Sequence, residues 1–94
     1  MKYIDVALVT VPHGIRNKID LFSAPAWSGL KAGDDIVIND RVRGTVSAVC
    51  TLNTEADEYK FLLKAFDRTH PLERIEGIYE FKPLFYKEDE NETL

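Results

Sequence analysis

The hydrophobic and polar positions of this chain change their spacing along its length. Residues 3–11 (YIDVALVTV) are β-branched and mostly apolar, which predicts a strand buried on both faces. The segment VPHG interrupts that strand, because Pro12 lacks a ladder donor and Gly14 permits a turn. Residues 18–25 (KIDLFSAP) predict a second short strand, and residues 26–34 (AWSGLKAGD) predict a loop or a single helical turn.

A β-hairpin is predicted for residues 30–49 (LKAGDDIVINDRVRGTVSAV). Ile36 and Ile38 share one face of its first strand, and Asn39, Asp40 and Gly44 supply the turn chemistry. The second strand alternates polar positions with apolar ones, which indicates half-buried antiparallel structure. Its predicted inward face comprises Val46, Ala48, Cys50 and Leu52.

The period then changes to that of a helix over residues 54–67 (TEADEYKFLLKAFD). An apolar stripe at i, i+3, i+4 and i+7 is typical of an amphipathic helix, with Thr54 as its expected cap and Pro71 beyond its end. Residues 74–82 (RIEGIYEFK) alternate again and predict a last strand. The stripe comprises Tyr59, Leu62, Leu63 and Phe66.

Short strands with glycine turns and one helix favour a mainly β fold. We expect a small, curved, five-stranded barrel of the SH3 or OB kind, with the helix inserted before the last strand. An open α+β sheet with the helix on one face is the alternative.

The chain of 94 residues has room for one domain, which we place at residues 1–87. Residues 88–94 (EDENETL) form an acidic tail that we expect to be disordered. The four acidic residues of this tail account for the whole formal charge of −4, so residues 1–87 are neutral. A neutral body lacks the strong basic footprint of a duplex-binding protein.

Neither a membrane span nor a secretion signal is predicted. No apolar run approaches the ~20 residues of a spanning helix, and Asp5 interrupts the apolar start of the chain. A single cysteine, Cys50, excludes an internal disulfide and fits a reducing compartment, so we expect a cytoplasmic protein that does not bind membranes.

The sequence carries no signature of catalysis, and we expect neither enzymatic activity nor a cofactor. It contains no phosphate-binding glycine loop and no Gly-x-Ser-x-Gly elbow. His13, Cys50 and His70 are scattered without metal-ligand spacing. We expect Cys50 to be a buried, inert thiol, His13 to be an exposed turn residue, and His70 to interact with the helix dipole.

Features suited to binding cluster in the predicted loops. Basic side chains in small-barrel loops contact phosphates, and an indole in a loop can stack on a base. The candidate contacts are Arg16, Lys18, Trp27, Arg41 and Arg43. The alternative is that Trp27 plugs one end of the barrel and that the arginines only solubilise turns; nearby acids, Asp34, Asp35 and Asp40, offset the same basic loops.

Four segments in order, YIDVALVTVP, KIDLFSAP, LKAGDDIVI and RGTVSAV, resemble the N-terminal 3′-DNA-end-binding domain of the replication-restart helicase family of primosomal protein N′. The resemblance covers residues 3–50. It implies a barrel that binds a free 3′ end, with Asp20 near the terminal sugar hydroxyl. Two departures weaken the implied pocket: Ile19 and Leu21 replace aromatic neighbours of the aspartate, and INDRVRG replaces a Val-Pro-Phe-Gly segment. Alternatively, Asp20 caps a loop.

Two functions are therefore expected for a non-catalytic module. In the first, Arg16, Lys18, Asp20, Trp27, Arg41 and Arg43 contact single-stranded nucleic acid or a strand end. In the second, the chain binds a protein partner or assembles with itself, through a sheet edge or an apolar cluster near its end. That cluster comprises Phe81, Leu84, Phe85 and Tyr86.

Overall fold

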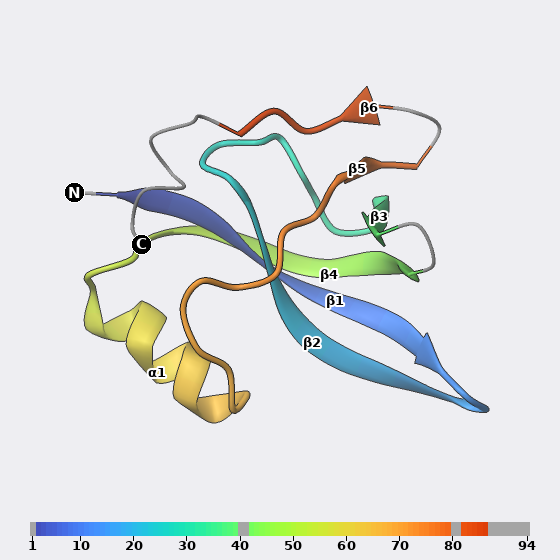
Figure 1. Cartoon of the computed structure of the whole chain (residues 1–94), viewed down its shortest axis with the longest axis horizontal. Coiled ribbons are helices and arrows are strands. Elements are labelled where there is room, and N and C mark those ends of the chain that lie inside the picture. Colours follow the sequence, from blue (N-terminus) through green and yellow to red (C-terminus); the bar gives the residue numbers. More distant parts are fainter. Residues whose placement is uncertain (1, 40–41, 80–81, 87–94) are drawn as a thin grey trace.

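The computed structural model describes residues 2–39, 42–79 and 82–86. These residues form one antiparallel sheet and one helix (Figure 1). The prediction of a mainly β chain with one helix is confirmed. In chain order the elements are β1 (Tyr3–His13), β2 (Arg16–Pro25), β3 (Asp35–Asn39), β4 (Val42–Asn53), α1 (Asp57–Ala65), β5 (Gly77–Ile78) and β6 (Lys82–Pro83).

The described sheet has six strands in the order β2-β1-β4-β3-β5-β6, and it is open. The predicted closed five-stranded barrel is therefore wrong, and the alternative of an open sheet with a helix is nearer to the fold. The reason lies after α1, where two two-residue strands, β5 and β6, form in place of the long closing strand predicted for residues 74–82. This segment meets the β2 edge through one isolated bridge, between Ser23 and Arg74.

Strand β1 lies between β2 and β4 and contributes to two apolar clusters. Ala7 and Val9 belong to the first cluster, with buried residues of β2, β3 and β4, and Val6 belongs to the second, beneath α1. The prediction that this strand is buried on both faces is confirmed. The fully buried Tyr59 anchors the helix on the second cluster, and the rest of the predicted stripe packs around it.

A β-bulge in β4 changes which residues face the core. Leu8 pairs with Ala48 and the next residue, Val9, pairs with Val46, so Ser47 is the extra residue. Val46 and Ala48 therefore point to opposite faces, and the predicted single inward face is wrong. As a consequence, the thiol of Cys50 is exposed, contrary to the prediction of a buried thiol.

The helix is shorter than its apolar pattern predicts. It begins at Asp57 after Ala56, which occupies the N-cap position without a side-chain hydrogen bond, so the expected cap at Thr54 is wrong. Residues 53–56 form a turn instead, in which the side-chain oxygen of Asn53 accepts the N–H of Glu55.

The β1–β2 hairpin extends away from the helix, so α1 and the hairpin tip lie at opposite ends of the long axis (Figure 1). Strand β1 continues through Pro12 to His13, further than predicted. Pro12 lies two residues beyond Thr10, the last residue of β1 that pairs with β4, where a missing ladder donor is tolerated.

Candidate functional site

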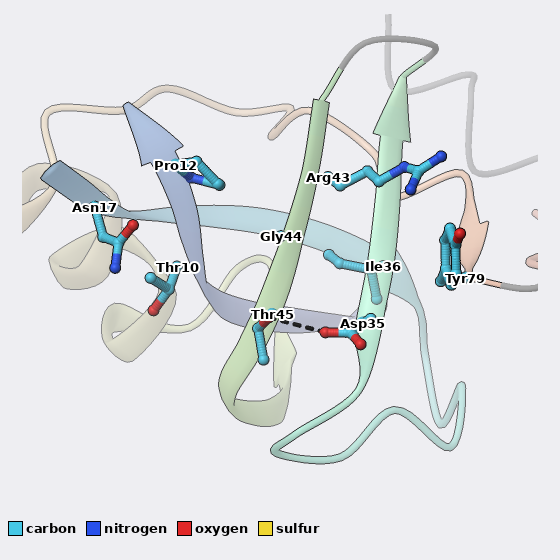
Figure 2. Close-up of a pocket in the computed structure, with 9 residues that line it drawn as sticks. All are labelled: Thr10, Pro12, Asn17, Asp35, Ile36, Arg43, Gly44, Thr45 and Tyr79. Carbon is cyan, nitrogen blue, oxygen red and sulfur yellow. Dashed lines mark hydrogen bonds between the residues drawn. The ribbon is translucent and has the colours of Figure 1, made fainter. Parts of the chain in front are cut away.

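An open cleft of about 450 Å³ crosses strands β1 to β4 (Figure 2). Residues from the β1–β2 hairpin form one side, and Arg43 with Tyr79 forms the other. The lining is mainly polar side chains with one aromatic ring. It comprises Thr10, Pro12, Asn17, Asp35, Ile36, Arg43, Gly44, Thr45 and Tyr79.

The register of the strands brings the polar side chains to one face. Thr10 pairs with Thr45 across β1 and β4, and Pro12 pairs with Asn17 across the hairpin, so alternate positions along β1 point the same way. The hydroxyl of Thr45 donates to the Asp35 carboxylate at 2.9 Å. Hydroxyl, amide and carboxylate groups therefore converge on one surface.

Gly44 lets strand β4 lie close to β1 beside the cleft. A Cβ atom at this buried position would lie 2.5 Å from Cγ1 of Val9 and 2.9 Å from the carbonyl oxygen of Thr10. Such distances are shorter than van der Waals contact, so only glycine lets β4 approach β1 closely here.

Arg43 and Tyr79 form the basic and aromatic side of the cleft. The guanidinium carbon of Arg43 lies 4.4 Å from the centroid of the Tyr79 ring, which is cation–π geometry. Tyr79 is held beside β3 because its N–H donates to the carbonyl of Asp35 at 2.8 Å. Within the described ranges no carboxylate forms an ion pair with Arg43.

Asp20 lies outside this cleft and is already engaged. Both of its carboxylate oxygens accept hydrogen bonds from Arg68, and one accepts the N–H of Leu21 at 2.8 Å. The hydrogen bond from Arg68 holds the pKa of Asp20 below its usual value and outweighs the effect of burial. The Asp20–Arg68 pair lies in a second, polar cavity of about 310 Å³. The Asp20 carboxylate therefore connects β2 to the segment that follows α1.

Trp27 is exposed, at 72%, which excludes the reading that it plugs the end of a barrel. Its ring lies 5.5 Å from that of Tyr3, and its backbone φ of 55° is in the left-handed region. The backbone N–H groups of Trp27 and Ser28 both donate to the Asp5 carboxylate, which holds this turn. Burial raises the pKa of Asp5, but these bonds with those from the Ser28 and Thr51 hydroxyls outweigh it and lower the pKa.

The structure does not gather the predicted nucleic-acid contacts in one place. Arg16 and Lys18 are exposed beside the hairpin tip, at the start of β2, whereas Trp27 follows the other end of that strand. Ten strand residues span roughly 30 Å. Among the predicted contacts that the structure describes, Arg43 alone lines the cleft; Asn17, which was not predicted, also lines it. Arg41 lies outside the described residues.

The predicted apolar contact cluster is largely used inside the molecule. Leu84 packs against the first core cluster, and the Tyr86 hydroxyl donates to the carbonyls of Ser23 and Ile75. Phe85 is exposed, at 82%. Phe81 lies outside the described residues.

The histidines and the cysteine do not meet. His13 is exposed in the hairpin, and Nδ1 of His70 lies 2.6 Å from the hydroxyl of Tyr59, whose pKa burial raises to about 12. In the described part of the chain no group of three or more His, Cys, Asp or Glu side chains could hold a metal ion. No helix among the described residues is long and apolar enough to cross a membrane.

Sequence reasoning missed three features of the site. In the sequence, Asn17 lies between two charged residues that are the more obvious candidates, and Tyr79 occupies one position of a predicted strand. Tyr79 lies far from Arg43 in the sequence, so no local pattern predicts that the two side chains are in contact. An apolar groove between α1 and β4 was also missed, because the bulge at Ser47 turns Cys50 toward solvent.

Comparison with known proteins gives no relative: no protein-family model, no curated protein and no solved structure matches the chain. The resemblance to the 3′-DNA-end-binding domain therefore stays a prediction.

Proposed function

We propose that this chain is a non-catalytic module that binds single-stranded nucleic acid, holding one nucleotide in the cleft between the β1–β2 hairpin and Tyr79. The observation that carries the proposal is the stacking of Arg43 on Tyr79 at the wall of an open cleft with a mixed polar and apolar lining. Arginine and an aromatic ring side by side offer a phosphate contact and a stacking surface, the two elements common to proteins that bind single strands.

The size and chemistry of the cleft suit one nucleotide. A volume of about 450 Å³ is within the roughly 300–1,000 Å³ of small-ligand pockets. The amide of Asn17 supplies donors and an acceptor for a base edge or a sugar, and the hydroxyl oxygen of Thr45, whose proton is donated to Asp35, supplies a further acceptor. Arg43 would pair with phosphate. Arg16 and Lys18 alternate with Asn17 along β2 and so project from the opposite face, where the Lys18 ammonium lies 3.8 Å from the Asp20 carboxylate.

In this arrangement two of the predicted contacts change role. We assign Asp20 a role in stability through Arg68, in place of the predicted contact with a sugar hydroxyl, because both of its carboxylate oxygens already accept hydrogen bonds. Trp27 lies too far along β2 to stack on the same nucleotide, although a longer strand could reach it.

The proposal is tested by fluorescence anisotropy with labelled single-stranded DNA at low and moderate salt. With Arg43 as the cation in contact, the logarithm of the affinity should fall with the logarithm of the salt concentration at a slope of about −0.7. Arg43→Ala should weaken binding about tenfold, and the charge-matched control Lys64→Ala, on α1, should not. Absence of binding at low salt, or equal effects of the two variants, would contradict the proposal.

The same titration with 3′-hydroxyl and 3′-phosphate strands tests the strand-end form of the proposal. Preference for the hydroxyl end would support end recognition; equal affinity would limit the function to single strands in general.

Protein interaction is the second candidate function. The observation that favours it is the apolar groove between α1 and β4, which is separate from the cleft.

A further inference from the structure

A groove of about 510 Å³ lies between α1 and β4, on the helix end of the molecule. It is lined by Cys50 and Leu52 from the strand and by Asp57, Glu58, Phe61 and Leu62 from the helix. None of these residues belongs to the cleft that carries the proposed function.

The groove exposes apolar surface that the fold does not use. Phe61 is 71% exposed, whereas the helix residues Tyr59 and Leu62 pack on the second core cluster. Phe61 lies on the shoulder of the helix, outside the apolar stripe, so its ring projects beside Leu52 without being covered. An uncovered aromatic side chain next to half-buried leucine is typical of a contact site for another chain.

Acidic residues flank the groove, whose own surface is almost entirely apolar. Asp57 and Glu58 line it, and Glu55 precedes them in an exposed turn. The helix lysines Lys60 and Lys64 do not line it. An apolar floor with carboxylates beside it is complementary to a segment that carries a bulky apolar side chain next to Lys or Arg.

We propose that the α1–β4 groove binds a basic, apolar peptide segment of a partner protein. In this complex the partner's apolar side chain packs between Phe61 and Leu52, and its basic side chains pair with Asp57 and Glu58. Two other occupants are disfavoured by charge. The chain's own last residues, 88–94, carry four acids, and a second copy docked symmetrically would place identical carboxylates against each other.

The test uses the full chain and three labelled synthetic peptides of equal length, composed of Leu and Lys, Leu and Glu, or Ser and Lys. The Leu–Lys peptide should bind, and the other two should bind at least about tenfold more weakly, because each lacks one half of the complementarity. Equal binding of the Leu–Lys and Leu–Glu peptides, or no binding of the Leu–Lys peptide, would overturn the proposal.

Two single-residue variants test whether the peptide binds in the groove. Phe61→Ala should weaken binding of the Leu–Lys peptide about tenfold, and Phe85→Ala, which removes an equally exposed ring elsewhere, should leave binding unchanged. Both positions are exposed, so both variants should fold. Equal effects of the two variants would overturn the placement.

Cys50 supplies a second readout that does not depend on a variant. As an exposed thiol in the groove, it should be alkylated more slowly when the Leu–Lys peptide is bound. A mass that rises with protein concentration, and that Phe61→Ala returns to the monomer, would instead assign the groove to a second copy. Faster alkylation of Cys50 after deletion of residues 88–94 would assign it to the chain's own tail.

Discussion

The guanidinium group of Arg43 stacks over the ring of Tyr79, with its carbon 4.4 Å from the ring centroid. Arg43 comes from β4 and Tyr79 follows β5, so the pair joins two segments that are distant in sequence. We expect Tyr79→Phe to retain binding of single-stranded DNA, because the ring is kept, and Tyr79→Ala to weaken it about tenfold. Anisotropy titrations of both variants check this. If both bind as the wild type does, the ring has no part in recognition.

Gly44→Ala should lower the free energy of unfolding by about 1–3 kcal/mol, since the added methyl would overlap Val9 and the backbone of Thr10. Urea unfolding followed by Trp27 emission measures the change. The exposed control Lys64→Ala should stay within about 0.5 kcal/mol of the wild type. A Gly44→Ala variant as stable as the wild type would show that β1 and β4 can separate at this point.

Asp5→Ala should destabilise the chain and alter the environment of Trp27. The carboxylate accepts four hydrogen bonds, from the N–H groups of Trp27 and Ser28 and from the hydroxyls of Ser28 and Thr51. Leaving these donors without a partner costs on the order of 1–3 kcal/mol. The emission spectrum of the folded variant should also shift, because the turn that presents the indole loses its anchor. An unchanged spectrum would mean that the stacking on Tyr3 is sufficient to hold the ring.

The Asp20–Arg68 pair should make stability depend on pH in the acidic range. The pKa of Asp20 in the folded chain is lowered, chiefly by the hydrogen bond from Arg68, so the folded state binds fewer protons than the unfolded state at this site. The stabilisation is therefore complete above the unfolded value of about 3.9 and is lost as the pH falls through the folded pKa. Asp20→Asn should be less stable at neutral pH, with a smaller further loss on acidification. Parallel stability curves for variant and wild type between pH 2 and 7 would contradict this.

The exposed thiol of Cys50 should react with iodoacetamide in the folded protein. The residue is exposed, but its sulfur is partly covered by neighbouring atoms. This partial burial, followed by the nearby charge of Asp5, raises the pKa of the thiol, so the rate should rise with pH and still be increasing above the range of an ordinary thiol. The measurement is the alkylation rate with and without denaturing urea. Modification only in urea would contradict the exposed position.

The pattern of residues predicts most of the local structure, and the errors have particular causes. The alternation of β1 and the apolar stripe of α1 are local signals, and both elements form where expected. The sequence does not indicate the bulge at Ser47, because the alternation of polar and apolar residues continues through that position. The bulge is the reason why Cys50 is exposed and not buried as predicted. Closure of the sheet depends on pairing between distant segments, which periodicity does not report.

The candidate site shows the same limit. Arg43 is predictable as an exposed cation near a turn, but its partner Tyr79 is 36 residues away and becomes its neighbour only through the pairing of β3 with β5. Asp20 is a clear candidate in the sequence, but its carboxylate forms an ion pair with Arg68, which lies beyond α1. The sequence therefore predicts single polar residues, and the structure is needed to identify their partners from distant segments.

The most direct test of nucleic-acid binding in the cleft is a titration of ¹⁵N-labelled protein with a short oligothymidylate at low salt, followed by amide chemical shifts. We predict that the shifts concentrate on Thr10, Asn17, Gly44 and Thr45 and leave the amides of α1 unchanged. No shifts at low salt, or shifts confined to α1 and the turn at Trp27, would contradict binding in the cleft.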